Sequence, residues 1–227
     1  DESFLDLCKA LDRVDGIERY RISSIEPNLL TDEIIDFVAA SRSFMPHFHI
    51  PLQSGSDKVL ALMRRRYDTA LYAAKIERVR RVLPDAFIGI DLIVGARGES
   101  SELFEDSRAF VAGLPVSHVH VFPYSERPGT RALEIDGVVE QAEKHRRVAV
   151  MTALSAEKHA DFARQYLGTI RPVLLEHPRK GMPMGGFTDN YLRIEADVDA
   201  SNDNLVRRMH LDTLGDDGET IKARLAD

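Results

Sequence analysis

The chain has 227 residues, of which 44% are hydrophobic and 30% charged, and its formal net charge is −7 at pH 7. This length supports one sizeable core, or a core with a small second domain, and the acidic balance argues against a generally basic nucleic-acid binder. The single cysteine excludes an intrachain disulfide framework. No run approaches the roughly 20 apolar residues that cross a bilayer, and nothing resembles a signal peptide. We therefore expect a cytoplasmic location and no membrane partner.

The chain begins within a predicted helix. Its first residue is Asp1 rather than Met, so we expect an excerpt of a longer protein. Phe4, Leu7, Cys8 and Leu11 follow helical spacing. This spacing predicts that Cys8 is a buried core thiol.

Short β-type runs alternate with amphipathic helices up to about residue 122. The predicted strands cover residues 20–25, 47–50, 87–94 and 116–122. Three helices are predicted between them, each with an apolar inner face. The first follows a Thr31 cap and buries Ile34, Ile35 and Val38, and the second buries Tyr72, Ile76, Val79 and Leu83. The third follows a Ser101 cap and buries Leu103, Phe110 and Leu114. This alternation predicts parallel βα units in an open sheet or a partial barrel.

The last part of the chain has a different pattern. A long helix is predicted from about 138 to 166, and Gly168 ends it. Five short β-type runs follow, at 169–176, 185–188, 191–195, 205–213 and 220–225. They predict a small antiparallel barrel, with domains at 1–167 and 168–227.

Polar residues follow each predicted strand of the first domain, where parallel sheets bind ligands. They are Ser23, Ser24 and Glu26, then 53–56, then Asp91 with 95–99, then 124–130. Hydroxyls, an amide and carboxylates beside glycines suit a polar small molecule that carries a ribose and an amino-acid end. Ordinary βα turns use the same residue types and are the alternative interpretation.

Two His-x-His pairs lie on predicted strands. His47 with His49, and His118 with His120, each place two rings on one strand face. Neutral imidazole is a common metal ligand, so a metal-dependent barrel hydrolase is one alternative function. Rings that pack internally and bond to neighbouring groups are the other interpretation.

A basic stretch interrupts the acidic chain. It consists of Arg64, Arg65 and Arg66, followed by Lys75, Arg78, Arg80 and Arg81. Such a stretch can follow RNA phosphates, although solvated helix faces have the same composition. A non-catalytic RNA-binding protein is therefore a further alternative.

Four motifs in order resemble the methylthiotransferases of the radical S-adenosylmethionine (SAM) superfamily. They are residues 21–27 (RISSIEP), 49–56 (HIPLQSGS) with 62–65, 91–95 (DLIVG) with Gly98 and Glu99, and 124–130 (YSERPGT). The sequence of residues 24–27 and 64–67 is most similar to the MtaB branch, which modifies N6-threonylcarbamoyladenosine next to the tRNA anticodon. The small barrel resembles the TRAM domain, an RNA-binding module of this family.

The resemblance implies the last four strands of a six-stranded α/β partial barrel, followed by the small barrel. It also implies SAM and two [4Fe-4S] clusters in the whole enzyme, with tRNA as substrate and a methylthio group added at C2 of the adenine. Clusters need cysteine thiolates, and this chain has one cysteine. We therefore expect no cluster on this chain, no catalysis by it alone, and self-association through the edge that a truncated barrel exposes.

By these motifs, the resemblance assigns Ser24, Glu26, Gln53, Ser54, Asp91, Val94 and Gly95 to the SAM pocket. It assigns Arg64, Arg65, Arg66, Arg97, Arg127, Arg179 and Lys180 to substrate or RNA. Arg97 stands in a Gly-Ala-Arg-Gly-Glu segment where the family commonly has Gly-Phe-Pro-Gly-Glu, which suggests a contact with the threonylcarbamoyl group. From Leu167 onward the chain has 8 Lys and Arg against 11 Asp and Glu, so RNA binding there requires a local patch such as Arg171, Arg179, Lys180 and Arg193.

Overall fold

The computed structural model describes residues 2–178 and 181–226 and divides into two compact units, Asp1–Ser155 and Ala156–Asp227. The division falls within α6 (Gln141–Arg164), so the last turns of that helix belong to the second unit. The other elements of the first unit, in chain order, are α1 (Phe4–Asp12), β1 (Tyr20–Ile22), α2 (Asp32–Ala40), β2 (Phe44–His49), α3 (Asp57–Leu62), α4 (Thr69–Val82), β3 (Phe87–Val94), α5 (Ser101–Gly113), β4 (His118–Pro123) and the 3₁₀ helix η1 (Arg131–Glu134).

The first unit is built on a four-stranded parallel sheet in the order β1-β2-β3-β4, which confirms the predicted βα architecture. The continuously apolar run 87–94 is β3 over its full length. The second strand begins at Phe44, earlier than the predicted His47. Pro46 lacks an N–H for a sheet ladder, but the ladder between β2 and β3 starts only at His47, so Pro46 interrupts no bond to β3.

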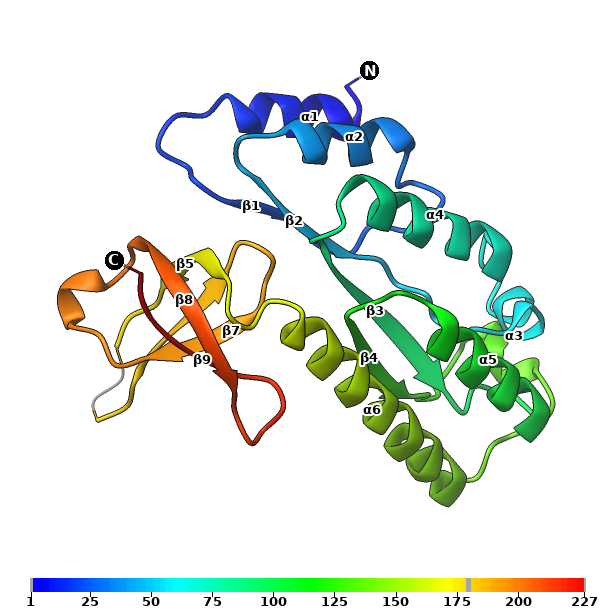
Figure 1. The fold of residues 1–227 in the computed structure, drawn as a ribbon. Coiled ribbons are helices and arrows are strands. Elements are labelled where there is room, and N and C mark those ends of the chain that lie inside the picture. Colours follow the sequence, from blue (N-terminus) through cyan, green and yellow to red (C-terminus); the bar gives the residue numbers. More distant parts are fainter. Residues whose placement is uncertain (1, 179–180, 227) are drawn as a thin grey trace. The chain divides into compact units, whose positions relative to one another are not determined.

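Helices cover one face of this sheet (Figure 1). The predicted inner faces of α2 and α4 are confirmed, since Ile34, Ile35, Val38, Tyr72, Ile76 and Val79 are all buried in the core. Cys8 is 1% exposed in the same core, as predicted.

The predicted start and face of α5 are partly wrong. Ser100, not Ser101, is the N-cap, because its Oγ accepts a hydrogen bond from the Leu103 N–H at 3.2 Å. The buried stripe is Phe104, Ser107 and Val111. Phe110 packs partly against the core, and Leu114 is buried at the C-cap. Leu103 lies to one side of this stripe, half-buried.

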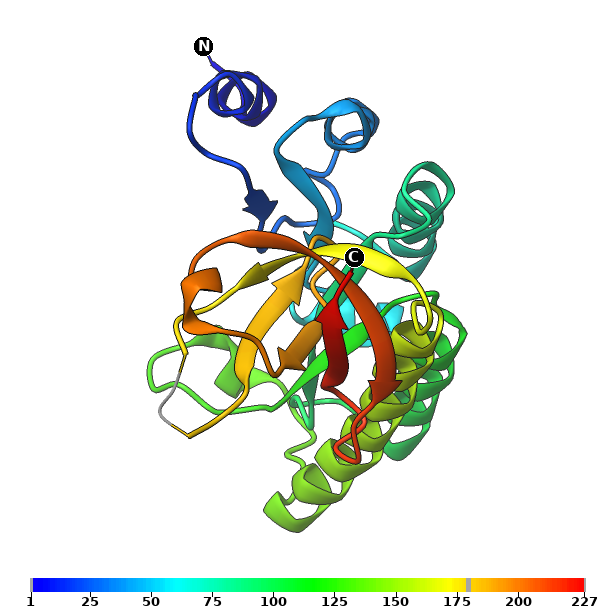
Figure 2. The same cartoon turned by 60° about the vertical axis from the view of Figure 1, so that its left-hand side comes forward.

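The second unit is a closed barrel in the order β5-β6-β7-β9-β8 (Figure 2). Its elements are β5 (Ile170–Leu175), β6 (Met184–Thr188), β7 (Arg193–Ala196), the 3₁₀ helix η2 (Ala200–Asn202), β8 (Val206–Leu214) and β9 (Ile221–Leu225). The predicted small barrel is confirmed, but its antiparallel pairing is wrong at one position. Strands β7 and β9 run parallel, because η2 and the long β8 intervene before the chain returns beside β7, so the barrel is mixed.

Glycine at 186 allows β5 and β6 to approach each other closely. A Cβ there would lie 2.5 Å from the Leu174 carbonyl oxygen. The interior of the barrel is filled by alternating residues of its strands, among them Val173, Leu175, Ile194, Met209, Leu211 and Ile221. Among the residues that the structure describes, no helix is both long and apolar enough to span a membrane.

His47 predicts acid sensitivity of the first unit. It is 7% exposed on β2, and burial, followed by the nearby Arg21 charge, lowers its pKa from 6.5 to about 4. The unfolded chain therefore binds more protons between these values, so stability is complete above pH 6.5 and falls as the pH decreases toward 4. We expect a loss of about 3 kcal/mol at most from this residue. Urea unfolding across this pH range measures it, and a His47→Gln variant with the same acid dependence as the parent would contradict it.

Candidate functional site

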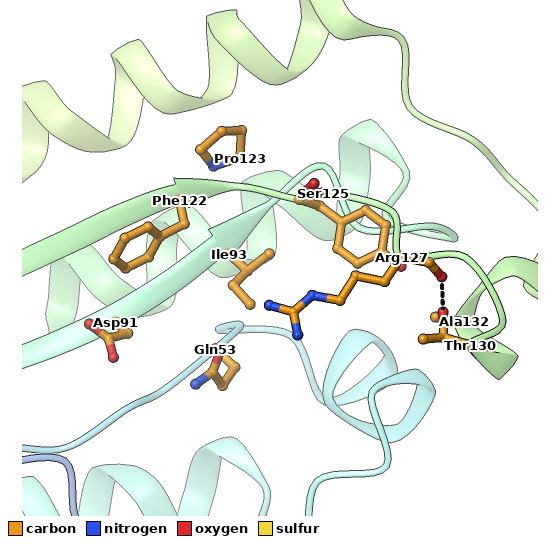
Figure 3. A pocket seen from close by; sticks show the side chains of 10 residues that line it. Gln53, Asp91, Ile93, Phe122, Pro123, Ser125, Arg127, Thr130 and Ala132 are labelled. Atoms are coloured by element: carbon orange, nitrogen blue, oxygen red, sulfur yellow. Dashed lines mark hydrogen bonds between the residues drawn. The ribbon is translucent and has the colours of Figure 1, made fainter.

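A cavity of 430 Å³ lies at the carboxyl ends of β3 and β4, and we call it the strand-end cavity. Its lining residues are Gln53, Asp91, Ile93, Phe122, Pro123, Tyr124, Ser125, Arg127, Thr130 and Ala132. Leu92 and Val94 are buried in the helix-covered core, so the alternating residues Asp91 and Ile93 face the other side of the sheet. Figure 3 shows Asp91, Ile93, Phe122 and Gln53 around one space, with the Arg127 guanidinium extending toward Gln53.

Two buried tyrosines hold the segment that leads to Gln53. The Tyr72 hydroxyl donates to the Ile50 carbonyl at 2.6 Å, and the Tyr67 hydroxyl donates to the Leu52 carbonyl at 3.0 Å. Gln53 itself has a φ of 71°, and its N–H donates to the Asp91 carbonyl at 2.8 Å. This fixed left-handed position sets the Gln53 side chain at the cavity wall.

The next residues of the loop are fixed against α5. The Gly55 N–H donates to Ser107 Oγ at 2.8 Å, and a Cβ on Gly55 would lie 2.8 Å from the Ser107 carbonyl oxygen. Ser54 is fully buried, and its hydroxyl accepts from the Ser56 N–H at 3.2 Å. The Gln-Ser-Gly-Ser motif is therefore a closely packed loop from which only Gln53 lines the cavity.

A buried ion pair fixes the loop after β3. Glu99 and Arg147 are each 2% exposed, and Arg147 Nη1 lies 2.7 Å from Glu99 Oε2. The same carboxylate oxygen accepts the Gly95 N–H, and Arg147 Nη1 also donates to the Glu99 carbonyl at 2.9 Å. Burial raises the pKa of the Glu99 carboxyl, while the bonds from Gly95 and Arg147 act in the opposite direction.

Glycine is required at 95 for two reasons. Its φ is +75°, and a Cβ there would lie 2.4 Å from Lys144 Cγ of α6. Lys144 is buried, and its Nζ donates to the Tyr124 carbonyl at 3.2 Å. The Tyr124 N–H in turn donates to the Val94 carbonyl at 2.8 Å, so α6 and the ends of β3 and β4 form one bonded unit around the cavity.

The cavity brings together three of the residues predicted for cofactor or substrate, Gln53, Asp91 and Arg127. Ser24 is exposed with a φ of 45°, and Glu26 forms an ion pair with Arg65 at 2.9 Å. Ser54, the Val94 side chain and Gly95 support the loops from behind the cavity wall. The binding roles of these positions stay predictions.

The other predicted basic residues are distributed over several places. Arg64 lines a different cavity, Arg66 is exposed, and Arg179 and Lys180 lie outside the described residues. Arg97 does not reach the strand-end cavity, because its guanidinium contacts Glu126 Oε1 at 2.6 Å and the Leu133 carbonyl at 2.8 Å. Of the barrel patch, Arg171 is paired with Asp189 through two contacts of 2.9 Å, so its charge is largely balanced there.

Three of the four strand histidines form a row of ring contacts, and the fourth, His47, stacks instead on Phe87 at 5.8 Å. His49 stacks on His120 at 5.2 Å, and His120 meets His118 edge to face at 4.5 Å. His49 Nε2 lies 2.8 Å from Asp91 Oδ1, which places the end of this row beside the cavity. Within the described ranges, no three His, Cys, Asp or Glu side chains are grouped to hold a metal ion.

Several lining residues were missed from the sequence, namely Ile93, Phe122, Pro123 and Ala132, whereas Thr130 belongs to the polar segment 124–130 that was singled out. Strand alternation would have identified Ile93 from Asp91, since residues two apart share a strand face. Ala132 carries no such signal, because it lies in the short 3₁₀ helix η1.

Comparisons with known proteins agree with this geometry. Residues 2–111 match the family model described as Radical SAM superfamily. The threonylcarbamoyladenosine tRNA methylthiotransferase MtaB of Bacillus subtilis (strain 168) is 37% identical over 199 residues, covering 86% of this chain and 44% of that protein. A tRNA-2-methylthio-N(6)-dimethylallyladenosine synthase of Actinobacillus succinogenes is 35% identical over 190 residues, covering 83% of this chain and 40% of that protein.

Among solved structures, coproporphyrinogen III oxidase (HemN) from Escherichia coli, described as a radical SAM enzyme, aligns with a TM-score of 0.52 and 17% identity. The alignment covers 74% of this chain and 44% of that one, and it supports the fold alone. The chain spans less than half the length of each of these relatives.

The Glu99–Arg147 pair predicts a large difference between two adjacent arginines of α6. Arg147→Met leaves the buried Glu99 carboxylate without its partner, so we expect a loss of about 3–5 kcal/mol in the free energy of unfolding. Arg146 is exposed and pairs with the half-buried Glu143 at the surface, so Arg146→Met should cost less than about 1 kcal/mol. Chemical denaturation measures both, and equal losses would contradict the assignment.

Proposed function

Because this chain belongs to the radical SAM superfamily, we propose that it is part of a tRNA methylthiotransferase that acts in the cytoplasm. In this proposal the strand-end cavity binds SAM, and the target is N6-threonylcarbamoyladenosine next to the anticodon. The observation that carries the proposal is that the cavity combines Gln53, Asp91 and Arg127 at the strand ends of a chain related to such enzymes.

The cavity suits the chemistry of SAM. Its volume of 430 Å³ falls within the usual range of small-molecule sites, about 300–1,000 Å³. SAM has an ammonium group, a carboxylate and a ribose, and the lining offers one carboxylate, one guanidinium and one amide in Asp91, Arg127 and Gln53. We assign Asp91 to the ammonium, Arg127 to a carboxylate and Gln53 to the ribose hydroxyls.

The residues of this chain do not fit an iron–sulfur cluster. Cys8 is the one cysteine, it is buried in α1, and burial raises the pKa of its thiol. A cluster requires several thiolates. In the proposal the two clusters are therefore held by residues outside these 227, and this chain positions SAM and the RNA.

The chemistry is thus divided between cofactor and protein. SAM bound beside a reduced cluster supplies radical and methyl-transfer chemistry. The protein contributes orientation: Gln53 is fixed by the bonds of Tyr67 and Tyr72, and the loop carrying Gly95 is fixed by Glu99. His49 Nε2 lies 2.8 Å from Asp91 Oδ1 and restrains this carboxylate.

Two substitutions test the SAM site. Asp91→Asn removes the charge assigned to the ammonium, and Gln53→Ala removes the amide, so we expect each to weaken SAM binding about tenfold in isothermal titration calorimetry. Glu77→Gln on the exposed side of α4 is the matched control and should bind like the parent. Unchanged affinity in both cavity variants would remove the assignment.

The reaction is tested by deleting the gene that encodes this chain and analysing tRNA nucleosides by mass spectrometry. We expect 2-methylthio-N6-threonylcarbamoyladenosine to disappear while the unthiolated N6-threonylcarbamoyladenosine accumulates. Re-expression of the complete gene should restore the modification. Loss of the methylthio group from dimethylallyladenosine instead would move the proposal to the second branch of relatives, and no change in either nucleoside would refute it.

A further inference from the structure

A second cavity, of 480 Å³, adjoins the first in the same unit, and we call it the η1 cavity. One wall is the end of α3 with the turn after it, and the other is η1 with the residue that follows it. The lining residues are Ala61, Leu62, Met63, Arg64, Arg131, Ala132, Glu134 and Ile135. Ala132 of η1 lines both cavities, so they adjoin at η1.

The walls of the η1 cavity are held in place by backbone contacts. Arg97 Nη1 donates to the carbonyls of Leu133 at 2.8 Å and Ile135 at 3.2 Å. The Gly98 N–H donates to the Gly137 carbonyl at 2.9 Å, and a Cβ on Gly98 would lie 2.7 Å from Leu62 Cδ1. Arg97 and Gly98 thus bring the two walls together, and the cavity is preformed.

The charges of the η1 cavity lack internal partners. Arg64 and Arg131, one on each wall, are exposed, and neither guanidinium has a hydrogen bond or ion pair within the part of the chain that the structure describes. The neighbouring Arg65 and Arg97 are, in contrast, paired with Glu26 and Glu126. Two uncompensated guanidinium groups across a cavity suit two anionic groups of one ligand.

The remaining lining residues suit a nucleoside. Leu62, Met63 and Ile135 present apolar surface to a ring, and the Glu134 carboxylate can accept a hydrogen bond from a base amino group. A nucleotide within an RNA strand has a phosphate on each side, which matches one arginine on each wall. A free mononucleotide would use only one of them.

We propose that the η1 cavity binds the RNA nucleotide adjacent to the one modified, with Arg64 and Arg131 each contacting one flanking phosphate. This inference rests on the proposed function, because it takes RNA as the substrate in the strand-end cavity. It explains how an acidic chain binds a polyanion: the contacts are concentrated at two arginines that carboxylates do not neutralise.

The test measures binding of a fluorescently labelled anticodon stem–loop RNA by anisotropy at several salt concentrations. For the double variant Arg64→Gln, Arg131→Gln we expect affinity to fall about tenfold or more and the salt slope to fall by about 1.4, since each single-strand phosphate contributes about 0.7. The double variant Lys9→Gln, Arg13→Gln removes the same charge from the exposed end of α1 and should match the parent. Arg64→Lys with Arg131→Lys should keep most of the slope.

Calorimetric SAM binding and the melting temperature show whether the first unit remains intact, and we expect both to be unchanged in the Arg64, Arg131 variant. Parent-like RNA affinity in that variant, an equal loss in the control variant, or no RNA binding by the parent even at low salt would each overturn the inference. None of these results depends on the tRNA nucleoside analysis, which judges the proposed function separately.

Discussion

The ion pair between Glu99 and Arg147 connects the loop after β3 to α6, and the cavity geometry depends on it. Burying two charges is costly, and the attraction between them repays this cost only when further hydrogen bonds satisfy both groups. Here Glu99 also accepts the Gly95 N–H, and Arg147 also contacts Glu143. The ion pair therefore holds the loop after β3 in one conformation, and that conformation places the end of β3 beside Tyr124.

Much of the fold could be predicted because the relevant signals are local. The apolar run 87–94 predicted a strand of the parallel sheet, and the spacing of Tyr72, Ile76 and Val79 indicated an inner helix face. Gly95 and Gly98 were interpreted as places where a ligand approaches the backbone, whereas in the structure the side chains of Lys144 and Leu62 approach them. The parallel pairing of β7 with β9 had no such signal, since it depends on how the strands close around the barrel.

The site was predicted less completely, because clustering in sequence does not determine where a side chain points. Ser54 and Gln53 are adjacent, yet Ser54 is fully buried and Gln53 lines the cavity. Arg97 is bound to carbonyls of η1, more than thirty residues further along the chain. Arg127 and Arg131, in contrast, keep their guanidinium groups unpaired among the described residues. Only the three-dimensional structure shows which arginines hold loops in place and which have guanidinium groups that a ligand could contact.

The two edge strands of the parallel sheet, β1 and β4, differ in what their backbone groups bond to. At β4, the Val119 N–H donates to Ser155 Oγ at 2.9 Å, so a helix hydroxyl occupies a position that a further strand would need. At the other edge, β1 is hydrogen-bonded in the sheet to β2. A further strand beside β4 would therefore have to displace the Ser155 hydroxyl of α6.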